Sequence, residues 1–406
     1  MYAKRLLSAV LSLSLMFSLC ACSTGQKAGK EVETEGVTEA VVSEEGTTGS
    51  EIQTESDMSS GAEMARETTT VDASGEFSMW NSQGTIQHLI DYVEAVTDEQ
   101  SDDFIPVADR IAVFDLDGTL VGEQFPIYFE WLMFAQRVLD DPDFQADDEM
   151  KEVAREILTA GQNRSIPEDI EEKESQLFGK AFDGMTTEEY RNYVRDFLSQ
   201  EADGFDGLTF GGAYYRPMTE VISYLEEHDF KVYICSGTDR DADRVMVSGF
   251  SDIPMYQVIG SDCYSEGSRH DEVYYLDYQF DPDEEVMRDD TRIIKNVKSS
   301  KVVQMAQELG QKPVLAFGNS SGDTSMFIYT TYNNPYKSAA FCLVPDDDER
   351  EYAYPEKVEK LKKSCEENGW YPVSMKDDFL TIYGDDVVKN AENLSFTEHL
   401  LETCPE

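Results

Sequence analysis

Residues 111 to 119 read IAVFDLDGT, a short apolar run followed at once by two carboxylates and a glycine. The apolar run from Arg110 to Phe114 predicts a buried strand. Asp115 and Asp117 stand two residues apart where the chain leaves that strand, and both can face one pocket if Gly118 lets the backbone turn. The stretch therefore predicts a strand whose carboxyl end carries two acidic side chains.

The chain around this stretch alternates between helical and strand-like patterns. We expect helices at 86–95, 221–225 and 302–309, and strands at 231–235, 256–259, 274–280, 313–317 and 339–344. This alternation predicts an α/β fold with a doubly wound, mostly parallel, Rossmann-like sheet.

A helical insert interrupts the alternation between residues 122 and 211. One amphipathic helix is marked by residues 150–158 and is expected to stop at Gly161. Another is opened by a capping box of Thr186 and Glu189. At least three helices are expected here, which together predict a helical cap domain inserted into the sheet domain.

Polar residues directly follow three of the predicted strands. They are Asp115, the pair Ser236 and Gly237, and the pair Gly318 and Asn319. Because ligands bind outside the carboxyl ends of parallel strands, we expect these three segments to converge on one site. The Ser236 hydroxyl and the Gly237 amide are suited to bind phosphate oxygens.

Attack by a carboxylate on phosphorus needs an ionised aspartate, a second acid for the departing oxygen and a nearby cation. Three lysines compete for the cationic position: Lys295, Lys298 and Lys301. Lys298 lies four residues before Val302 and so continues the apolar stripe of the predicted helix, whereas Lys301 is rotated about 100 degrees away. We therefore expect Lys298 to face the site.

Taken together, the four segments resemble the motifs of the haloacid dehalogenase superfamily of aspartate-nucleophile phosphatases. The resemblance implies that Asp115 is the nucleophile that forms an aspartyl-phosphate, and that Asp117 is the general acid that later activates water. It also implies that Thr119 and Lys298 bind phosphate, with Lys298 paired to Asp115. Dehalogenase members lack the second acid, so Asp117 disfavours dehalogenation.

The resemblance covers most of residues 107–345, and the insert resembles the cap of the phosphoserine-phosphatase-like branch. It implies a small phosphorylated substrate. Arg164 and Arg240 are candidate contacts for a substrate anion, and Glu123 or Gln124 lies near the position of a family glutamate that contacts a substrate amine.

The resemblance further implies a Mg²⁺ cofactor. Its expected ligands are the Asp115 carboxylate, the Asp117 backbone carbonyl, Asn319, and Asp323 directly or through water. The commonest family pattern has an aspartate where this chain has Asn319. An asparagine carbonyl can serve as a magnesium ligand, with less charge and weaker affinity.

The N-terminal region predicts export and a membrane anchor. Residues 6–19 are mostly apolar but shorter than the roughly 20 residues of a spanning helix. Residues 19–23 resemble a bacterial lipobox, which implies lipidation of Cys22 and an extracytoplasmic location on the bacterial cell membrane. An ordinary cleaved signal and an uncleaved anchor are the alternatives.

These patterns divide the chain into four parts. We expect a lipoprotein signal peptide at 1–22, a disordered acidic tether at 23–76, a core formed by 77–121 and 212–406, and the cap at 122–211. Residues 346–406 are expected to pack onto the core. No oligomeric state is predicted.

Composition adds two restrictions. The chain has 82 acidic and 33 basic residues, and only 13 of the acidic ones lie in the first 76 residues, so the acidity belongs to the folded part and disfavours nucleic-acid binding. The five cysteines after Cys22 are an odd number, which excludes a full disulfide framework. Cys235 and Cys342 are expected as small apolar residues in buried strands, and one bridge among the others stays open.

The favoured interpretation is a magnesium-dependent phosphomonoesterase. A phosphotransferase of the same fold, or a non-catalytic binding protein of the cell surface, are the alternatives.

Overall fold

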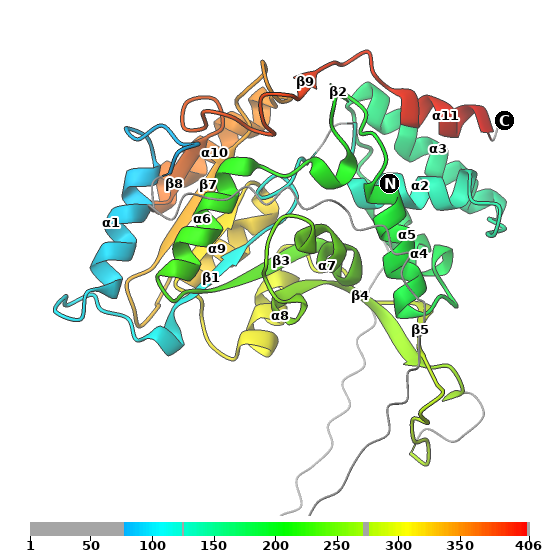
Figure 1. The fold of residues 1–406 in the computed structure, drawn as a ribbon, viewed down its shortest axis with the longest axis horizontal. Coiled ribbons are helices and arrows are strands. Elements are labelled where there is room, and N and C mark those ends of the chain that lie inside the picture. The colour runs from blue at the N-terminus through cyan, green and yellow to red at the C-terminus, as the bar shows by residue number, and fades with distance from the viewer. Residues whose placement is uncertain (1–76, 124–125, 271–275, 404–406) are drawn as a thin grey trace, which may run out of the picture. The chain divides into compact units, whose positions relative to one another are not determined.

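A computed structural model describes residues 77–123, 126–270 and 276–403 (Figure 1). The predicted signal peptide, the lipidation site at Cys22, the acidic tether and Cys404 lie outside the described residues. Within the described ranges, none of the helices combines the length and the apolar character that crossing a bilayer requires.

Seven strands form one sheet in the order β5-β4-β3-β1-β6-β7-β8. They are β1 (Ile111–Phe114), β3 (Lys231–Asp239), β4 (Val258–Gly267), β5 (Val286–Ile294), β6 (Leu315–Gly318), β7 (Ala339–Val344) and β8 (Tyr371–Ser374). Neighbouring strands pair in parallel, except for β4 and β5, which are antiparallel. The predicted α/β fold with a mostly parallel sheet is confirmed, and β1 is its central strand.

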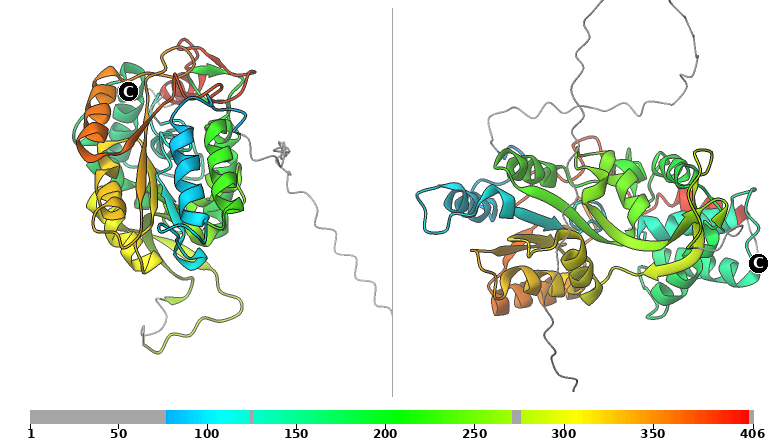
Figure 2. Two further views of the ribbon diagram at one scale, coloured as in Figure 1. Left: turned by 90° about the vertical axis from the view of Figure 1, so that its left-hand side faces the viewer. Right: turned by 90° about the horizontal axis from the view of Figure 1, so that it is seen from below.

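Helices cover both faces of the sheet (Figure 2). One face carries α1 (Ile86–Thr97), α6 (Arg216–Glu227) and α7 (Arg240–Ser248), and the other carries α8 (Ser299–Leu309), α9 (Thr324–Thr331) and α10 (Pro355–Asn368). Because β1 is buried on both faces, its residues are all apolar instead of alternating between apolar and polar.

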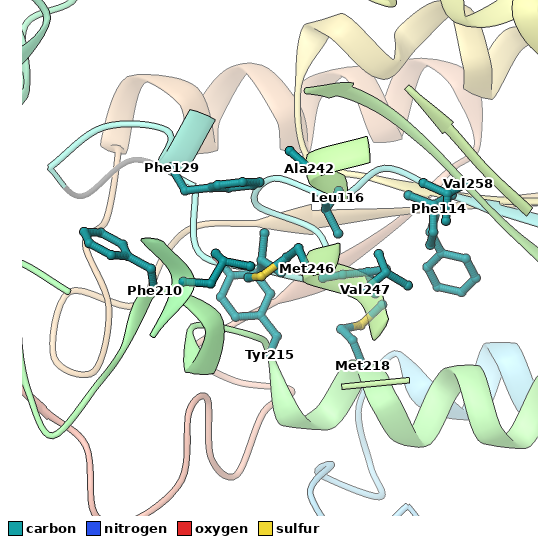
Figure 3. Packing of buried hydrophobic residues seen from close by; sticks show 14 of the residues in the cluster. Phe114, Leu116, Phe129, Phe210, Tyr215, Met218, Ala242, Met246, Val247 and Val258 are labelled. Atoms are coloured by element: carbon teal, nitrogen blue, oxygen red, sulfur yellow. The ribbon is translucent and has the colours of Figure 1, made fainter. Parts of the chain in front are cut away.

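Aromatic rings tie the central strands together on the face that α1, α6 and α7 cover. Phe114 stacks on Phe317 with 4.2 Å between ring centroids, and Phe317 on Phe341 with 5.2 Å. Met218 of α6 and Val247 of α7 lie close to Phe114 (Figure 3). This packing fixes the end of β1, and hence the start of the Asp115 loop, relative to β6.

Four helices lie between β1 and α6: α2 (Phe129–Leu139), α3 (Asp148–Asn163), α4 (Ile170–Ala181) and α5 (Thr187–Leu198). The capping box is confirmed, since Thr186 and Glu189 each accept a hydrogen bond from the other's amide. The expected stop at Gly161 is wrong. Gly161 lies within α3, where a Cβ would come within 3.2 Å of Pro126, and the helix ends instead at Arg164 in the left-handed conformation.

The strand expected at 274–280 is also wrong in its described part, because residues 276–280 contain no strand. The strand is β5, which begins at Val286 and carries several charged side chains of the kind that strands usually lack. Arg288 is nevertheless buried there, 2.8 Å from Asp239 and stacked 3.8 Å from the ring centre of Tyr190. Partners from other segments therefore allow this charged sequence to form a strand.

The C-terminal region packs onto the core, as predicted. β8 extends the sheet beside β7, and β9 (Val388–Lys389) pairs with β2 (Phe205–Asp206). The N-terminus of α11 (Ser395–Thr403) is capped by Asp203, which accepts hydrogen bonds from the amides of Phe396 and Thr397. The region thus contacts both the sheet and the segment that follows α5.

The cysteines in the described residues are buried free thiols: Cys235, Cys263, Cys342 and Cys365. The expectation that Cys235 and Cys342 are buried in strands is confirmed. No bridge joins these four cysteines.

Glu351 is a buried carboxyl in the C-terminal region, and its burial predicts that the stability of the protein depends on pH. Burial raises the pKa of its carboxyl to about 7, although the Tyr383 hydroxyl donates a hydrogen bond to it. Because this pKa lies above that of the unfolded chain, the protein loses stability as the pH rises through 7 and the carboxyl ionises. We expect Glu351→Gln to raise the melting temperature at about pH 8 and to change it little at about pH 5. An equal effect at both pH values in thermal melts would contradict this account.

Candidate active site

Three segments from distant parts of the chain meet at the carboxyl ends of the central strands. Asp115 follows β1, Thr238 lies near the end of β3, and Asn319 follows β6. Since β1 lies between β3 and β6, this edge is a point where the strand order reverses, as in other ligand-binding sheets. The predicted convergence is confirmed, and all three residues line a cavity of about 310 Å³.

The two aspartates of the first loop both line this cavity and are largely buried. The Thr119 hydroxyl lies 3.4 Å from Asp115 Oδ2, and the Thr238 hydroxyl donates a hydrogen bond to Asp117 Oδ2 at 2.8 Å. Gly118 has a φ of +76°, and a Cβ there would lie 1.8 Å from the Asn319 amide nitrogen. Only glycine therefore lets the two loops approach so closely.

Lys301, and not Lys298, contacts the predicted nucleophile. Its Nζ lies 2.5 Å from Asp115 Oδ1 and 2.7 Å from Asp323 Oδ1, and its side chain is buried. The helix α8 begins at Ser299, so Lys298 precedes the helix and is exposed, whereas Lys301 lies in its first turn. The pairing predicted for Lys298 is wrong because helical spacing was applied to a residue outside the helix.

Burial raises the pKa of both aspartates. For Asp115, burial and the nearby charge of Asp323 raise the pKa to about 7, while Lys301 opposes the rise. For Asp117, burial and the charge of Asp115 raise the pKa to about 8, while the hydrogen bond from Thr238 opposes it. Burial disfavours the charge on Lys301, but the two carboxylates outweigh it and raise the lysine pKa. Asp117 is therefore mainly protonated at neutral pH, as a general acid must be.

The two residues predicted to follow the strand and to bind phosphate, Ser236 and Gly237, lie within β3, because the strand continues past Cys235 to Asp239. They differ in position. Gly237 lines the cavity. Ser236 is fully buried behind it, where its hydroxyl accepts a hydrogen bond from the Thr238 amide at 3.1 Å. Thr238 lines the cavity instead, because the pairing of β3 is irregular between Cys235 and Asp239. Sequence reasoning missed Thr238, although a hydroxyl residue two positions after Ser236 was a visible signal.

Asp323, expected as a metal ligand, is occupied by other contacts. Its Oδ1 pairs with Lys301, and its Oδ2 accepts hydrogen bonds from the amides of Asn319 and Ser320. Among the residues with assigned positions, no group of three or more His, Cys, Asp or Glu side chains is arranged to hold a metal ion. These contacts favour a supporting position for Asp323, in which it holds Lys301 and the Asn319 loop.

Two residues of the cavity carry a buried side-chain oxygen that has no hydrogen-bond partner within the described structure: Asp117 Oδ1 and Asn319 Oδ1. Asp117 Oδ1 is suited to carry the proton of the general acid, because Oδ2 accepts the hydrogen bond from Thr238. Buried polar atoms normally have a partner, so Asn319 Oδ1 is suited to bind a ligand in the cavity. Magnesium prefers oxygen ligands, and Asn319 Oδ1 together with the Asp115 carboxylate of the same cavity fits a magnesium ion.

The helical insert supplies another wall of the cavity. Glu130 and Trp131 of α2 and Glu171 of α4 line it. Glu130 is held by Lys295, 3.0 Å away, and by the Asp239 amide, which donates to it at 2.9 Å. The wall from α2 is thus anchored to the sheet domain beside the aspartates.

The candidate substrate contacts fall into different places. Arg240 pairs with Asp262 at 2.7 Å and with Glu308 at 3.2 Å, which leaves it outside the cavity lining. Glu123 lines the cavity and forms an ion pair with Lys357. Arg164 lines a second, adjoining cavity. Gln124 lies outside the described residues.

Searches against protein-family models and against curated proteins returned no match. Similar solved structures include a protein of unknown function from Anaerococcus prevotii (TM-score 0.44, 13% identity, covering 75% of this chain and 96% of that one). Another is a phosphoserine phosphohydrolase-like protein from Francisella tularensis (TM-score 0.35, 15% identity, covering 65% of this chain and 94% of that one). A third is a HAD family hydrolase from Salmonella enterica (TM-score 0.35, 12% identity, covering 67% of this chain and 69% of that one). At this distance the similarities assign no activity, and the chemistry rests on the site's own side chains.

Proposed function

We propose that this protein is a magnesium-dependent phosphomonoesterase that acts on a small phosphorylated molecule through an aspartyl-phosphate intermediate. The observation that carries the proposal is the pairing of Asp115 with the buried Lys301, 2.5 Å away, beside a second aspartate with a raised pKa. This supplies the nucleophile, the cation and the acid that phosphoryl transfer to a carboxylate needs.

In the first step, the Asp115 carboxylate attacks phosphorus and the ester oxygen departs with a proton from Asp117. An aspartyl-phosphate and a free alcohol result. In the second step, Asp117, now ionised, takes a proton from water as that water attacks phosphorus. The bond to Asp115 breaks, inorganic phosphate is released, and both aspartates return to their starting states. Lys301 offsets negative charge beside Asp115 throughout.

Magnesium would be held by the Asp115 carboxylate, the Asn319 side-chain oxygen and the backbone carbonyl of Asp117, which is the ligand that the family resemblance implies. When bound, the ion would offset the negative charge of the phosphoryl oxygens. Asp323 would support the site through Lys301 and the Asn319 loop.

We further propose that the protein is exported and lipid-anchored through Cys22 on the outer side of the bacterial cell membrane. The support for this is the short apolar run at residues 6–19 and the lipobox-like sequence that follows it. An extracytoplasmic enzyme of this kind would meet substrates outside the cytoplasm.

Phosphate release from an aryl phosphate, measured as magnesium is titrated into the chelator-treated protein, tests the proposed activity. We expect turnover that requires magnesium. Asn319→Asp adds a charged ligand in place of a neutral one, so we expect half-maximal activity at a lower magnesium concentration, by about tenfold. Turnover insensitive to the chelator would contradict the proposed activity, and an unchanged titration in Asn319→Asp would contradict ligation by Asn319.

A further inference from the structure

A second cavity of about 970 Å³ adjoins the one that holds the aspartates. The two cavities share seven lining residues, among them Tyr128 and Lys298, so they lie side by side. The outer cavity extends from the end of α3 to α10. Its volume is in the range of cavities that bind whole small molecules, so a substrate can extend well beyond its phosphoryl group.

Basic residues gather around the outer cavity, although the chain as a whole is strongly acidic. The basic lining residues are Arg164, Lys298, Lys357 and Lys360. Lys357 forms an ion pair with Glu123, and the Arg164 guanidinium stacks 4.8 Å from the ring centre of Tyr354. Among the described residues, Lys298 and Lys360 form no ion pair. Two positive charges therefore border the cavity without a matching carboxylate.

Acidic side chains are present as well, since Glu171 and Glu356 also line the outer cavity. The charge count alone therefore does not identify what binds there. The backbone at Lys298 provides the independent observation.

Lys298 has a φ of 53° and a ψ of −120°, a combination that is favourable for glycine and costly for any residue with a Cβ. It is one of four non-glycine residues with positive φ in the described part of the chain, and Arg164 is another. Strained backbone of this kind is enriched at active sites and ligand contacts, where the surrounding structure holds it. A glycine at 298 would relieve the strain but would remove the ammonium group from the junction of the two cavities.

We propose that the outer cavity binds a second anionic group of the substrate, a phosphate or a carboxylate, through Lys298 and Lys360. The inference rests on the proposed phosphatase activity and specifies its substrate class: small molecules that carry an anionic group in addition to the phosphate that is cleaved. The inner cavity takes the reacting phosphate at Asp115, and the ammonium groups of Lys298 and Lys360 pair with the distant anion.

Three probe compounds distinguish the possible anions: a hexose monophosphate, a hexose bisphosphate and a phosphorylated aldonic acid, which carries a carboxylate. We expect kcat/KM to be higher for the bisphosphate, the aldonic acid or both than for the monophosphate. Both ammonium groups are exposed, and an exposed ion pair contributes up to about 1 kcal/mol, so two of them correspond to a preference of roughly fivefold to thirtyfold. Preference for only one of the two identifies the anion as phosphate or carboxylate.

The variants Lys298→Gly and Lys360→Gln are each expected to reduce that preference by up to about fivefold. Lys298→Gly is also expected to keep or raise the melting temperature, because it removes backbone strain. The matched control is Lys363→Gln, which changes an exposed lysine of the same helix α10, outside both cavities, and should leave the preference unchanged. A preference that survives in both Lys298→Gly and Lys360→Gln overturns the proposed site.

Binding separates this inference from the phosphatase activity itself. We expect calorimetry with Asp115→Asn to give tighter binding of the favoured two-anion compound than of the monophosphate, and Lys298→Gly in that background to remove the difference. Equal binding of all three compounds overturns the inference. Absence of turnover in the unsubstituted protein would contradict the proposed activity but would leave this binding comparison decisive.

Discussion

Asp115→Asn is expected to lower kcat for an aryl phosphate by at least about 10⁴-fold, because an amide cannot replace a carboxylate as the nucleophile. Asparagine has nearly the same shape, so the buried loop keeps its packing. Lys301 loses one of its two carboxylate partners but retains Asp323 at 2.7 Å. The loss should therefore be in the chemical step rather than in folding.

The control for this variant is its thermal melt and circular dichroism spectrum, which should match those of the unsubstituted protein closely. A well-folded Asp115→Asn protein that retains a tenth or more of the activity would contradict the nucleophile assignment. It would then favour attack by water directly on the phosphate.

Lys301→Met should also abolish most activity, by roughly 10²-fold to 10⁴-fold in kcat/KM. Lys301 opposes the rise in the pKa of Asp115, so its removal raises that pKa further above about 7 and leaves less ionised nucleophile at neutral pH. The phosphate also loses its nearest buried cation. The activity lost should be partly recovered as the pH of the assay is raised from about 7 to about 8, because more of Asp115 then ionises, and the activity should fall again at higher pH as Asp117 loses its proton.

Removal of a buried partner also costs stability, by about 3–5 kcal/mol for an ion pair of this kind. Lys301→Arg therefore accompanies Lys301→Met, since it keeps the charge. We expect Lys301→Arg to restore the melting temperature in part, and its activity to exceed that of Lys301→Met. For the aryl phosphate, kcat/KM of Lys298→Met should be at least about tenfold higher than kcat/KM of Lys301→Met. A lower value for Lys298→Met would contradict the assignment of Lys301.

The parts of the fold that follow from local pattern could be predicted. Residues 111–114 and 339–344 are continuous apolar runs, and both form interior, parallel strands. Because such strands end at a common edge, the meeting of Asp115 with Asn319 also followed from the sequence. The capping box at Thr186 was recognisable because both of its hydrogen bonds are local.

What could not be predicted depends on exact element ends and on distant partners. The choice between Lys298 and Lys301 depended on the first residue of α8, and helix ends are the least certain feature of a sequence pattern. The strand β5 was missed because Arg288 is buried only through partners more than 40 residues away in the chain, Asp239 among them. Thr238 was missed because the irregular pairing of β3 is not visible in the sequence.

The central claim is that Asp115 carries the phosphoryl group during turnover. Its most direct test is to quench the protein in acid during magnesium-supported turnover of an aryl phosphate, to reduce the trapped acyl phosphate with borohydride, and to locate the modified residue by peptide mass spectrometry. We predict modification at Asp115 alone, absent when magnesium or substrate is omitted. Turnover with no modified aspartate, or with the modification at Asp117 or another residue, would contradict the claim.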